Sequence, residues 1–220
     1  MTAGLRLMLY DRACRGRGLA PGLSHAWTAG GAVFRARGRF DHVAGAGSWA
    51  AGLDALLAAA ATQPIAEIQF WGHGEWGGLW IDEERLTAAA LEPDHYLHAR
   101  LVALRARLVP GGQALWWFRS CDVFGTQRGH DFARAWTRFF GCRAAGHTHQ
   151  ILLLQSGLHV LAPGAEPTWP LDEGVAPGLP RARLELARPA HDHVPPHRAA
   201  PPCVSRRRPS GSSPRSACRG

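Results

Sequence analysis

Lysine is absent from this sequence of 220 residues, and all 25 basic side chains are arginine. Cysteine is scarce. The five cysteines, an odd number, are spread along the chain, and no two of them form a CxxC pair. These cysteines are Cys14, Cys121, Cys142, Cys203 and Cys218. The pattern argues against a disulfide framework or a zinc ribbon, and it favours a reducing compartment.

Long hydrophobic runs are also absent. The apolar patch Leu7–Tyr10 is followed by Asp11 and Arg12, and it is too short for the core of a signal peptide. No run approaches the roughly 20 residues that span a membrane. We therefore expect a soluble, cytoplasmic protein without a membrane partner.

Acidic residues are scarce at the C-terminal end. Residues 181–220 contain nine arginines but only Glu185 and Asp192 as acids, so +7 of the formal charge of +8 lies there. We therefore expect no nucleic-acid binding except through this basic tail. Its Pro, Arg, Ser and Gly content, with few large apolar side chains, is typical of disorder. We predict one α/β domain over residues 1–175 and a disordered tail over residues 176–220.

Hydrophobic periodicity predicts alternating strands and helices. The expected strands are Leu5–Tyr10, Ile65–Trp71, Ala114–Phe118, Cys142–Ala145, Ile151–Leu154 and Leu158–Leu161, with Leu79–Ile81 as a small edge strand and Ala32–Arg37 as a strand or extended loop. The expected helices run from the N-cap Ser48 to Ala61, from Pro93 to Leu108, and from beyond Gly129 to Phe140, with Gly141 as a left-handed stop. This order predicts a mainly parallel sheet with helices on both faces, a three-layer sandwich.

Two of these strands carry a reactive side chain at their carboxyl ends. The apolar run Ile65–Trp71 leads directly into Gly72-His73-Gly74, and Ala114–Phe118 is followed closely by Cys121. In open α/β sheets ligands bind at this edge. A thiol and an imidazole delivered to one edge are the parts that a cysteine nucleophile and its base require.

This arrangement of strand, His-Gly, helix, strand and Cys resembles the caspase-like cysteine peptidases, a group that includes caspases, gingipains, legumains and separases. The matching pieces are Gly72-His73-Gly74, Gly78-Leu79, the helix over 97–108, Ser120-Cys121-Asp122 and the helix over 129–140. The resemblance covers about residues 60–146. In the order of its motifs the chain is most similar to bacterial caspase-like domains of unknown function.

The resemblance implies that Cys121 is the nucleophile and His73 its acid/base partner, with the Gly74 amide as an oxyanion donor. It implies hydrolysis of a peptide or protein substrate and indicates no cofactor or metal. Caspases carry Gln-Ala where this chain has Arg119-Ser120, so specificity for acidic residues is not carried over.

Two other functions stay open on the sequence. The fold could be kept as a non-catalytic interaction module. Alternatively, Gly146-His147-Thr148-His149 matches the last metal motif of calcineurin-like phosphoesterases, and two such histidines could bind one ion of a two-metal site. The other motifs of that family, Asp-x-His and Gly-Asn-His-Glu, are missing. A polar loop that lines the cleft, with His147 or His149 contacting substrate, is the simpler interpretation.

Most of the nine tryptophans fall on predicted core faces. Trp71, Trp76 and Trp80 flank the His-Gly loop instead, and they are candidate walls of a substrate pocket. Asp122, directly after the cysteine, is a further candidate substrate contact.

Overall fold

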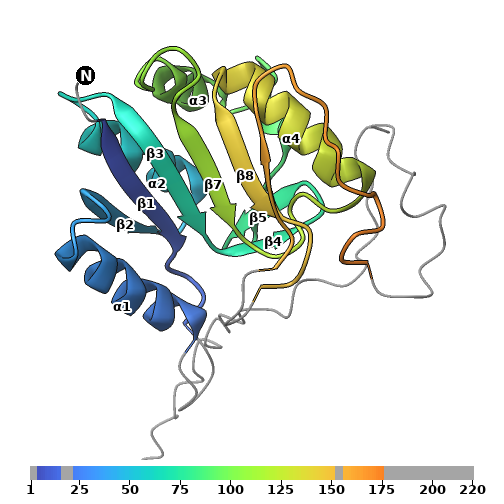
Figure 1. The fold of residues 1–220 in the computed structure, drawn as a ribbon. Helices are drawn as coiled ribbons and strands as arrows, with labels where there is room; N and C mark the ends of the chain where they lie inside the picture. The colour runs from blue at the N-terminus through green and yellow to red at the C-terminus, as the bar shows by residue number, and fades with distance from the viewer. Residues whose placement is uncertain (1–3, 16–21, 152–155, 176–220) are drawn as a thin grey trace, which may run out of the picture.

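The computed structural model describes residues 4–15, 22–151 and 156–175 (Figure 1). The tail predicted over residues 176–220 and most of the strand predicted over Ile151–Leu154 lie outside these ranges. Within them, the chain has the mixed α/β fold that the sequence predicts.

A six-stranded sheet forms the centre of the fold, with the order β2-β1-β3-β7-β8-β9. Its strands are β1 (Leu5–Asp11), β2 (His42–Ala46), β3 (Ile65–Trp71), β7 (Leu115–Arg119), β8 (Arg143–His147) and β9 (Leu158–Leu161). All neighbours are parallel except β8 and β9, which are antiparallel. The predicted mainly parallel sheet is therefore confirmed, and the carboxyl ends of its parallel strands share one edge.

Helices cover both faces of the sheet (Figure 1). Successive side chains of a strand point to opposite faces, so Leu9 packs under α2 (Trp49–Ala59) while Met8 packs under α1 (Leu23–Ala36). The helices α3 (His98–Arg105) and α4 (Thr126–Phe140) share the large apolar cluster with α2. Within the described residues, one α-helix thus covers one face and three cover the other.

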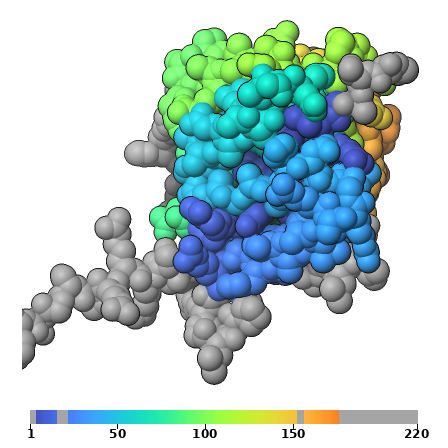
Figure 2. All heavy atoms as spheres, turned by 90° about the vertical axis from the view of Figure 1, so that its left-hand side faces the viewer, coloured from blue at the N-terminus to red at the C-terminus, as the bar shows by residue number. Residues whose placement is uncertain are grey.

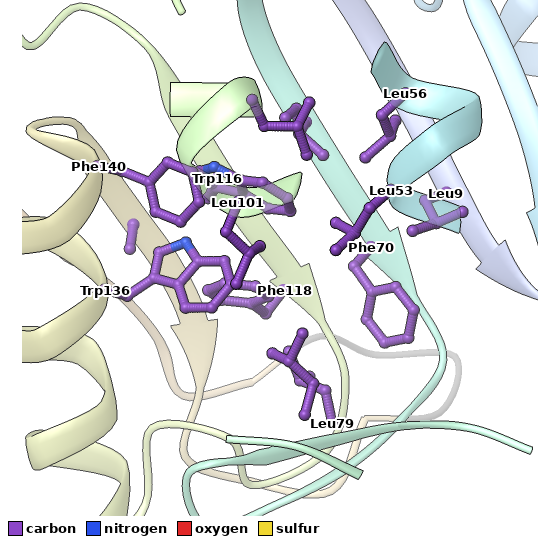
Figure 3. Packing of buried hydrophobic residues seen from close by; sticks show 14 of the residues in the cluster. Leu9, Leu53, Leu56, Phe70, Leu79, Leu101, Trp116, Phe118, Trp136 and Phe140 are labelled. Carbon is purple, nitrogen blue, oxygen red and sulfur yellow. The ribbon is translucent and has the colours of Figure 1, made fainter. Parts of the chain in front are cut away.

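Aromatic side chains of β7 lie in the middle of this larger cluster (Figure 3). Trp116 meets Trp136 of α4 edge-on at 5.2 Å between ring centroids, and Phe118 meets the same ring at 5.3 Å. Both β7 rings are about 1% exposed. Because a fully buried aromatic side chain contributes several kcal/mol, this packing fixes the strand that leads to Cys121.

Several predicted helix boundaries are confirmed. Ser48 caps α2 by accepting a hydrogen bond from the Ala51 amide at 3.2 Å, and Gly141 ends α4 with φ of 60°. Three boundaries were misplaced: α3 spans His98–Arg105 rather than Pro93–Leu108, and α4 begins at Thr126, before Gly129.

The expected strand or loop over Ala32–Arg37 is wrong, since these residues are mostly the last turns of α1. Trp27 and Phe34 on this helix pack against a second aromatic cluster that includes Phe40 and Trp71. The many small residues of α1 hide the helical period in the sequence. The short strand β2 was not predicted, because it contains only one large apolar residue, Val43.

A small antiparallel sheet lies at the carboxyl edge of the main sheet. It contains β4 (His73–Glu75), β5 (Gly78–Ile81) and β6 (Glu84–Leu86). The predicted edge strand over Leu79–Ile81 is therefore confirmed as part of β5. Only Gly72 separates this small sheet from β3, so the sheet starts with His73.

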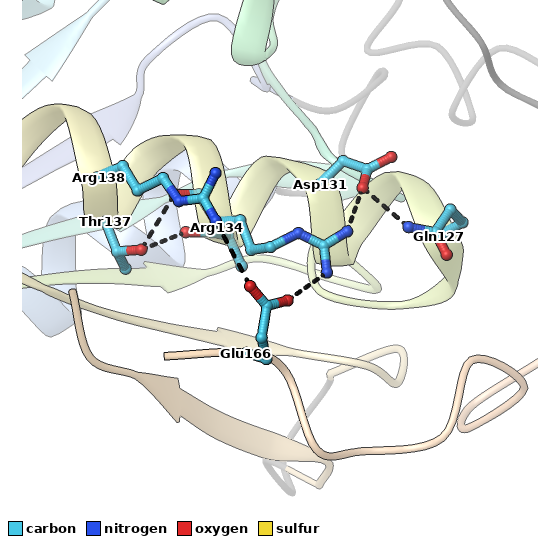
Figure 4. Close-up of polar contacts among 7 residues, drawn as sticks. Gln127, Asp131, Arg134, Thr137, Arg138 and Glu166 are labelled. Atoms are coloured by element: carbon cyan, nitrogen blue, oxygen red, sulfur yellow. Dashed lines mark hydrogen bonds and ion pairs between the residues drawn. The ribbon is translucent and has the colours of Figure 1, made fainter. Parts of the chain in front are cut away.

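The segment after β9 returns along α4. There Glu166 forms ion pairs with Arg134 at 2.9 Å and Arg138 at 3.5 Å, and Arg134 also pairs with Asp131 (Figure 4). The Trp169 ring, 6% exposed, anchors the same segment to the core. This segment therefore belongs to the folded domain.

The N-terminal half of the chain forms most of one side of the molecule, where α1 and α2 are seen (Figure 2). Among the described residues, every helix is too short or too polar to span a lipid bilayer.

Candidate functional site

The strands β3 and β7 place His73 and Cys121 at the same edge of the sheet. They are adjacent and parallel, with Trp71 opposite Arg119. His73 and Cys121 each lie two residues beyond this pair. The two strands therefore bring these residues to the same edge, and both side chains are partly exposed.

Backbone hydrogen bonds join the histidine segment to the cysteine segment. The Trp76 amide donates to the Asp122 carbonyl at 3.0 Å, and the Gly77 amide donates to the Val123 carbonyl at 2.9 Å. These bonds hold the turn between β4 and β5 against the loop that follows Cys121. The two segments therefore form one structural unit.

Gly74 is in close contact with the cysteine segment. A Cβ at this position would lie 2.6 Å from the Ser120 Cβ and 2.8 Å from the Cys121 carbonyl oxygen. Both distances are shorter than a real Cβ tolerates. The glycine is thus required for the close approach of the two backbones, whatever its part in binding an oxyanion.

We predict that Gly74→Ala costs about 1–3 kcal/mol of unfolding free energy, because the added methyl group must displace Ser120 and Cys121. Urea unfolding measures this loss. The matched control is Gly47→Ala, whose Cβ would meet no closer atom than an arginine nitrogen 3.9 Å away. Equal stabilities of the two variants would contradict the packing described for Gly74.

The His73 ring lies toward β1 and α1. Its Nε2 is 3.4 Å from the Sγ of Cys14, and its ring meets Trp27 edge-on at 5.8 Å. Burial lowers the pKa of His73, and the negative charge of Asp11 partly opposes this. The imidazole is therefore mainly neutral at physiological pH and can accept a proton.

The Cys121 thiol lies toward the segment that follows β8. Its Sγ accepts a hydrogen bond from the Ile151 amide at 3.3 Å and lies 3.7 Å from the Ile151 carbonyl oxygen. Burial raises the pKa of Cys121, the Ile151 amide lowers it, and the Asp122 carboxylate raises it further. The resting group is consequently a thiol rather than a thiolate.

Within the described ranges, no hydrogen bond joins Cys121 to His73. The two side chains share one edge of the sheet but contact different loops. His73 contacts the loop after β1, and Cys121 contacts the loop after β8. Their direct pairing during a reaction stays a prediction.

Cys14 also lies at this edge of the sheet, beside the candidate histidine. The loop after β1 gave no regular sequence signal, yet β1 neighbours β3 and brings Cys14 to His73. Cys14 is disulfide-bonded. This bond was not expected from the cysteine spacing. Among the described cysteines, Cys121 and Cys142 are reduced, and burial raises the pKa of Cys142 to about 12.

Asp122 has a conformation and a charge state that set it apart. Its φ is 54°, and its Oδ1 is buried without a hydrogen-bond partner among the described residues. Burial raises the pKa of Asp122 from 3.8 to about 6, and the nearby Glu75 carboxylate adds to the rise. The protonation state of this group therefore changes close to physiological pH.

We expect Asp122→Asn to be more stable than the wild type at about pH 8 and nearly equal to it only at about pH 3.5, below the ordinary pKa of the carboxyl group. The pKa of Asp122, about 6, is higher than its ordinary value of 3.8, so the folded protein binds this proton more tightly than the unfolded chain does. Wild-type stability should thus rise as pH falls through this window. Asparagine tolerates positive φ. Urea unfolding at both pH values measures the difference, and a difference that does not change with pH would contradict it.

Two tryptophans expected at a pocket wall have different surroundings. Trp71 is 8% exposed and packs among Phe34 and Phe40, with the Arg119 guanidinium 4.0 Å above its ring. Its contacts are therefore those of a core residue. Trp76 is partly exposed, has φ of 29° and lies in the turn beside Cys121.

The two histidines after β8 also differ. His147 is fully buried, with Nδ1 2.9 Å from the Ser156 carbonyl oxygen. His149 is more exposed, and its Nδ1 is 3.9 Å from a Glu173 carboxylate oxygen. In the part of the chain that the structure describes, no three His, Cys, Asp or Glu side chains are grouped so as to hold a metal ion.

Sequence reasoning missed Asp11, a buried carboxylate at the end of β1 whose charge acts on His73. It also missed Glu173, which lies 2.7 Å from His159. Asp11 is the last residue of the apolar strand β1, and His73 lies two residues beyond the end of the apolar strand β3. This shared position at strand ends is a sequence signal that could have identified Asp11.

No protein-family model matches the chain, and the search of curated proteins finds no significant match.

Proposed function

We propose that this protein is a caspase-like, cysteine-dependent hydrolase of peptide or amide bonds, with Cys121 as nucleophile and His73 as acid and base. The observation that supports the proposal is the register of β3 and β7, in which Trp71 lies opposite Arg119. Both candidate groups follow that pair by two residues at the edge where α/β proteins bind ligands.

The protonation states favour general-base catalysis. Burial raises the pKa of Cys121 and lowers that of His73, so the resting pair is a thiol and a neutral imidazole. His73 takes the proton from Cys121 as the sulfur attacks the carbonyl carbon. The Ile151 amide, 3.3 Å from Sγ, stabilises negative charge that develops on the sulfur.

The remaining steps follow from proton balance. The attack converts the carbonyl into a tetrahedral oxyanion, and backbone amides near Gly74 and Cys121 are the proposed donors to it. When the oxyanion collapses, the carbon–nitrogen bond breaks and His73 returns its proton to the leaving amine. Water activated by the neutral His73 then hydrolyses the thioester and releases the acid and the Cys121 thiol.

The test is cleavage of a peptide library prepared from a denatured proteome, with new termini identified by mass spectrometry. The wild type should generate new termini, and Cys121→Ser should not. Chelation with EDTA should leave cleavage unchanged. Absence of cleavage by the wild type would favour an interaction module, and EDTA-sensitive hydrolysis of a phosphate ester would favour the phosphoesterase alternative.

A further inference from the structure

The end of β1 meets the end of β3 at the candidate site. The strands are adjacent and parallel, with Tyr10 opposite Trp71. Asp11 follows Tyr10 immediately, and His73 lies two residues beyond Trp71. A carboxylate and an imidazole are therefore placed at neighbouring strand ends.

The Asp11 carboxylate is buried and held in position. The residue is only 1% exposed, and its Oδ1 accepts a hydrogen bond from the Ala13 amide at 2.8 Å. The backbone of Asp82 also lowers the pKa of this carboxylate. The hydrogen bond from the Ala13 amide thus fixes its orientation.

The loop that begins at Asp11 continues onto the His73 ring. Three residues later, the Cys14 sulfur lies 3.4 Å from His73 Nε2, and Trp27 of α1 meets the same ring. Since Cys14 is disulfide-bonded, it does not titrate. Among the described residues, the negative charge of Asp11 acts on His73, and that of Asp82 acts in turn on Asp11.

We propose that Asp11 is a positioning residue for His73: its buried carboxylate, fixed by the turn at Ala13, stabilises the imidazolium that forms when His73 accepts a proton. This role rests on the proposed function for its catalytic meaning. Burying a carboxylate costs free energy unless a positive charge or hydrogen-bond donors compensate. A neutral His73 leaves part of that cost in place, and a protonated His73 relieves it. The two groups should therefore favour each other's charged forms.

The experiment is an NMR titration of the full chain, in which the His73 ring resonances are assigned by their loss in His73→Gln. Asp11→Asn should shift the His73 titration midpoint downward, because the negative charge is removed. Asp54→Asn, an exposed carboxylate paired with Arg100, is the matched control and should leave the midpoint unchanged. An unchanged midpoint in Asp11→Asn would overturn the proposal.

A reciprocal measurement keeps the proposal falsifiable if Asp11→Asn does not fold. By linkage, loss of the His73 charge must act on Asp11 as loss of Asp11 acts on His73. In His73→Gln, the carboxyl carbon of Asp11 should therefore titrate at a higher pH than in the wild type. An Asp11 midpoint that does not move would overturn the proposal by itself.

The activity arm separates this inference from the proposed function. In Asp11→Asn, the acidic limb of the pH–rate profile should move to lower pH and kcat should fall with little change in KM. If the NMR shifts occur but Cys121→Ala still hydrolyses peptides, the two charges interact and the proposed function is wrong. If Cys121→Ala is inactive but the midpoints do not move, the dyad stands and the role of Asp11 is wrong.

Discussion

Cys121→Ala should abolish hydrolysis of any peptide that the wild type cleaves, and His73→Ala should reduce kcat by about 10² to 10⁴-fold, the usual contribution of a general base. In the proposed mechanism the sulfur forms the covalent bond to the substrate, so no neighbouring group can replace it. In the same mechanism His73 both accepts the thiol proton and protonates the leaving amine. Initial rates on one cleaved peptide measure both effects.

The double variant gives the sharper result. Since the two groups act in one step, Cys121→Ala combined with His73→Ala should be scarcely slower than Cys121→Ala alone. Cys142→Ala is the matched control, because Cys142 is reduced but only 1% exposed, and it should keep wild-type turnover. Full activity of Cys121→Ala, or its loss in Cys142→Ala, would assign the chemistry to another group.

Trp169→Ala should destabilise the domain by about 3 kcal/mol or more, the usual cost of truncating a buried large aromatic side chain. The indole stacks on Phe124 at 5.6 Å and on His159 at 4.6 Å, and its Nε1 donates to the Phe124 carbonyl at 2.9 Å. Phe124 lies three residues after Cys121. Loss of this side chain therefore loosens both the C-terminal segment and the cysteine loop, which thermal unfolding and amide exchange can measure.

Glu166→Gln is the control for the same segment. This variant removes the ion pairs of Glu166 with Arg134 and Arg138. All three side chains in these pairs are at least partly exposed to solvent. Exposed pairs contribute only about 0–1 kcal/mol, so this variant should unfold close to the wild type. A larger loss in Glu166→Gln than in Trp169→Ala would show that charge, rather than packing, holds the segment.

The strands of this fold could be predicted where apolar runs were long. Ile65–Trp71 and the run before Cys121 are continuous apolar sequence, which is typical of central strands in a parallel sheet. In β7 the face with Trp116 and Phe118 is buried, while Leu115 and Trp117 on the other face are partly exposed. The helix α1 was missed because its glycines and alanines weaken the periodic signal, while Trp27 and Phe34 alone make its aromatic contacts. Small residues suit a helix that packs closely on a sheet, but they leave little pattern.

The candidate site could be predicted in its position and only partly in its contacts. Parallel strands place their carboxyl ends together, so the shared edge of His73 and Cys121 followed from topology. The contacts of each side chain depend on loops without periodicity. The Cys14 contact with His73 and the Ile151 contact with Cys121 both come from such loops. The partnership of Asp11 with His73 required the order of β1 and β3, which the sequence did not define.

The most direct test of the account is the alkylation rate of Cys121 by iodoacetamide from about pH 5 to about pH 9, a range that includes the ordinary pKa values of histidine and cysteine. Peptide mass spectrometry follows Cys121 in the wild type and in His73→Ala, without any knowledge of the substrate. Because His73 accepts the thiol proton, we predict that His73→Ala slows the alkylation of Cys121 near neutral pH and leaves the rates at high pH similar. Superimposable rate profiles for the two proteins across the whole range would contradict the proposed dyad.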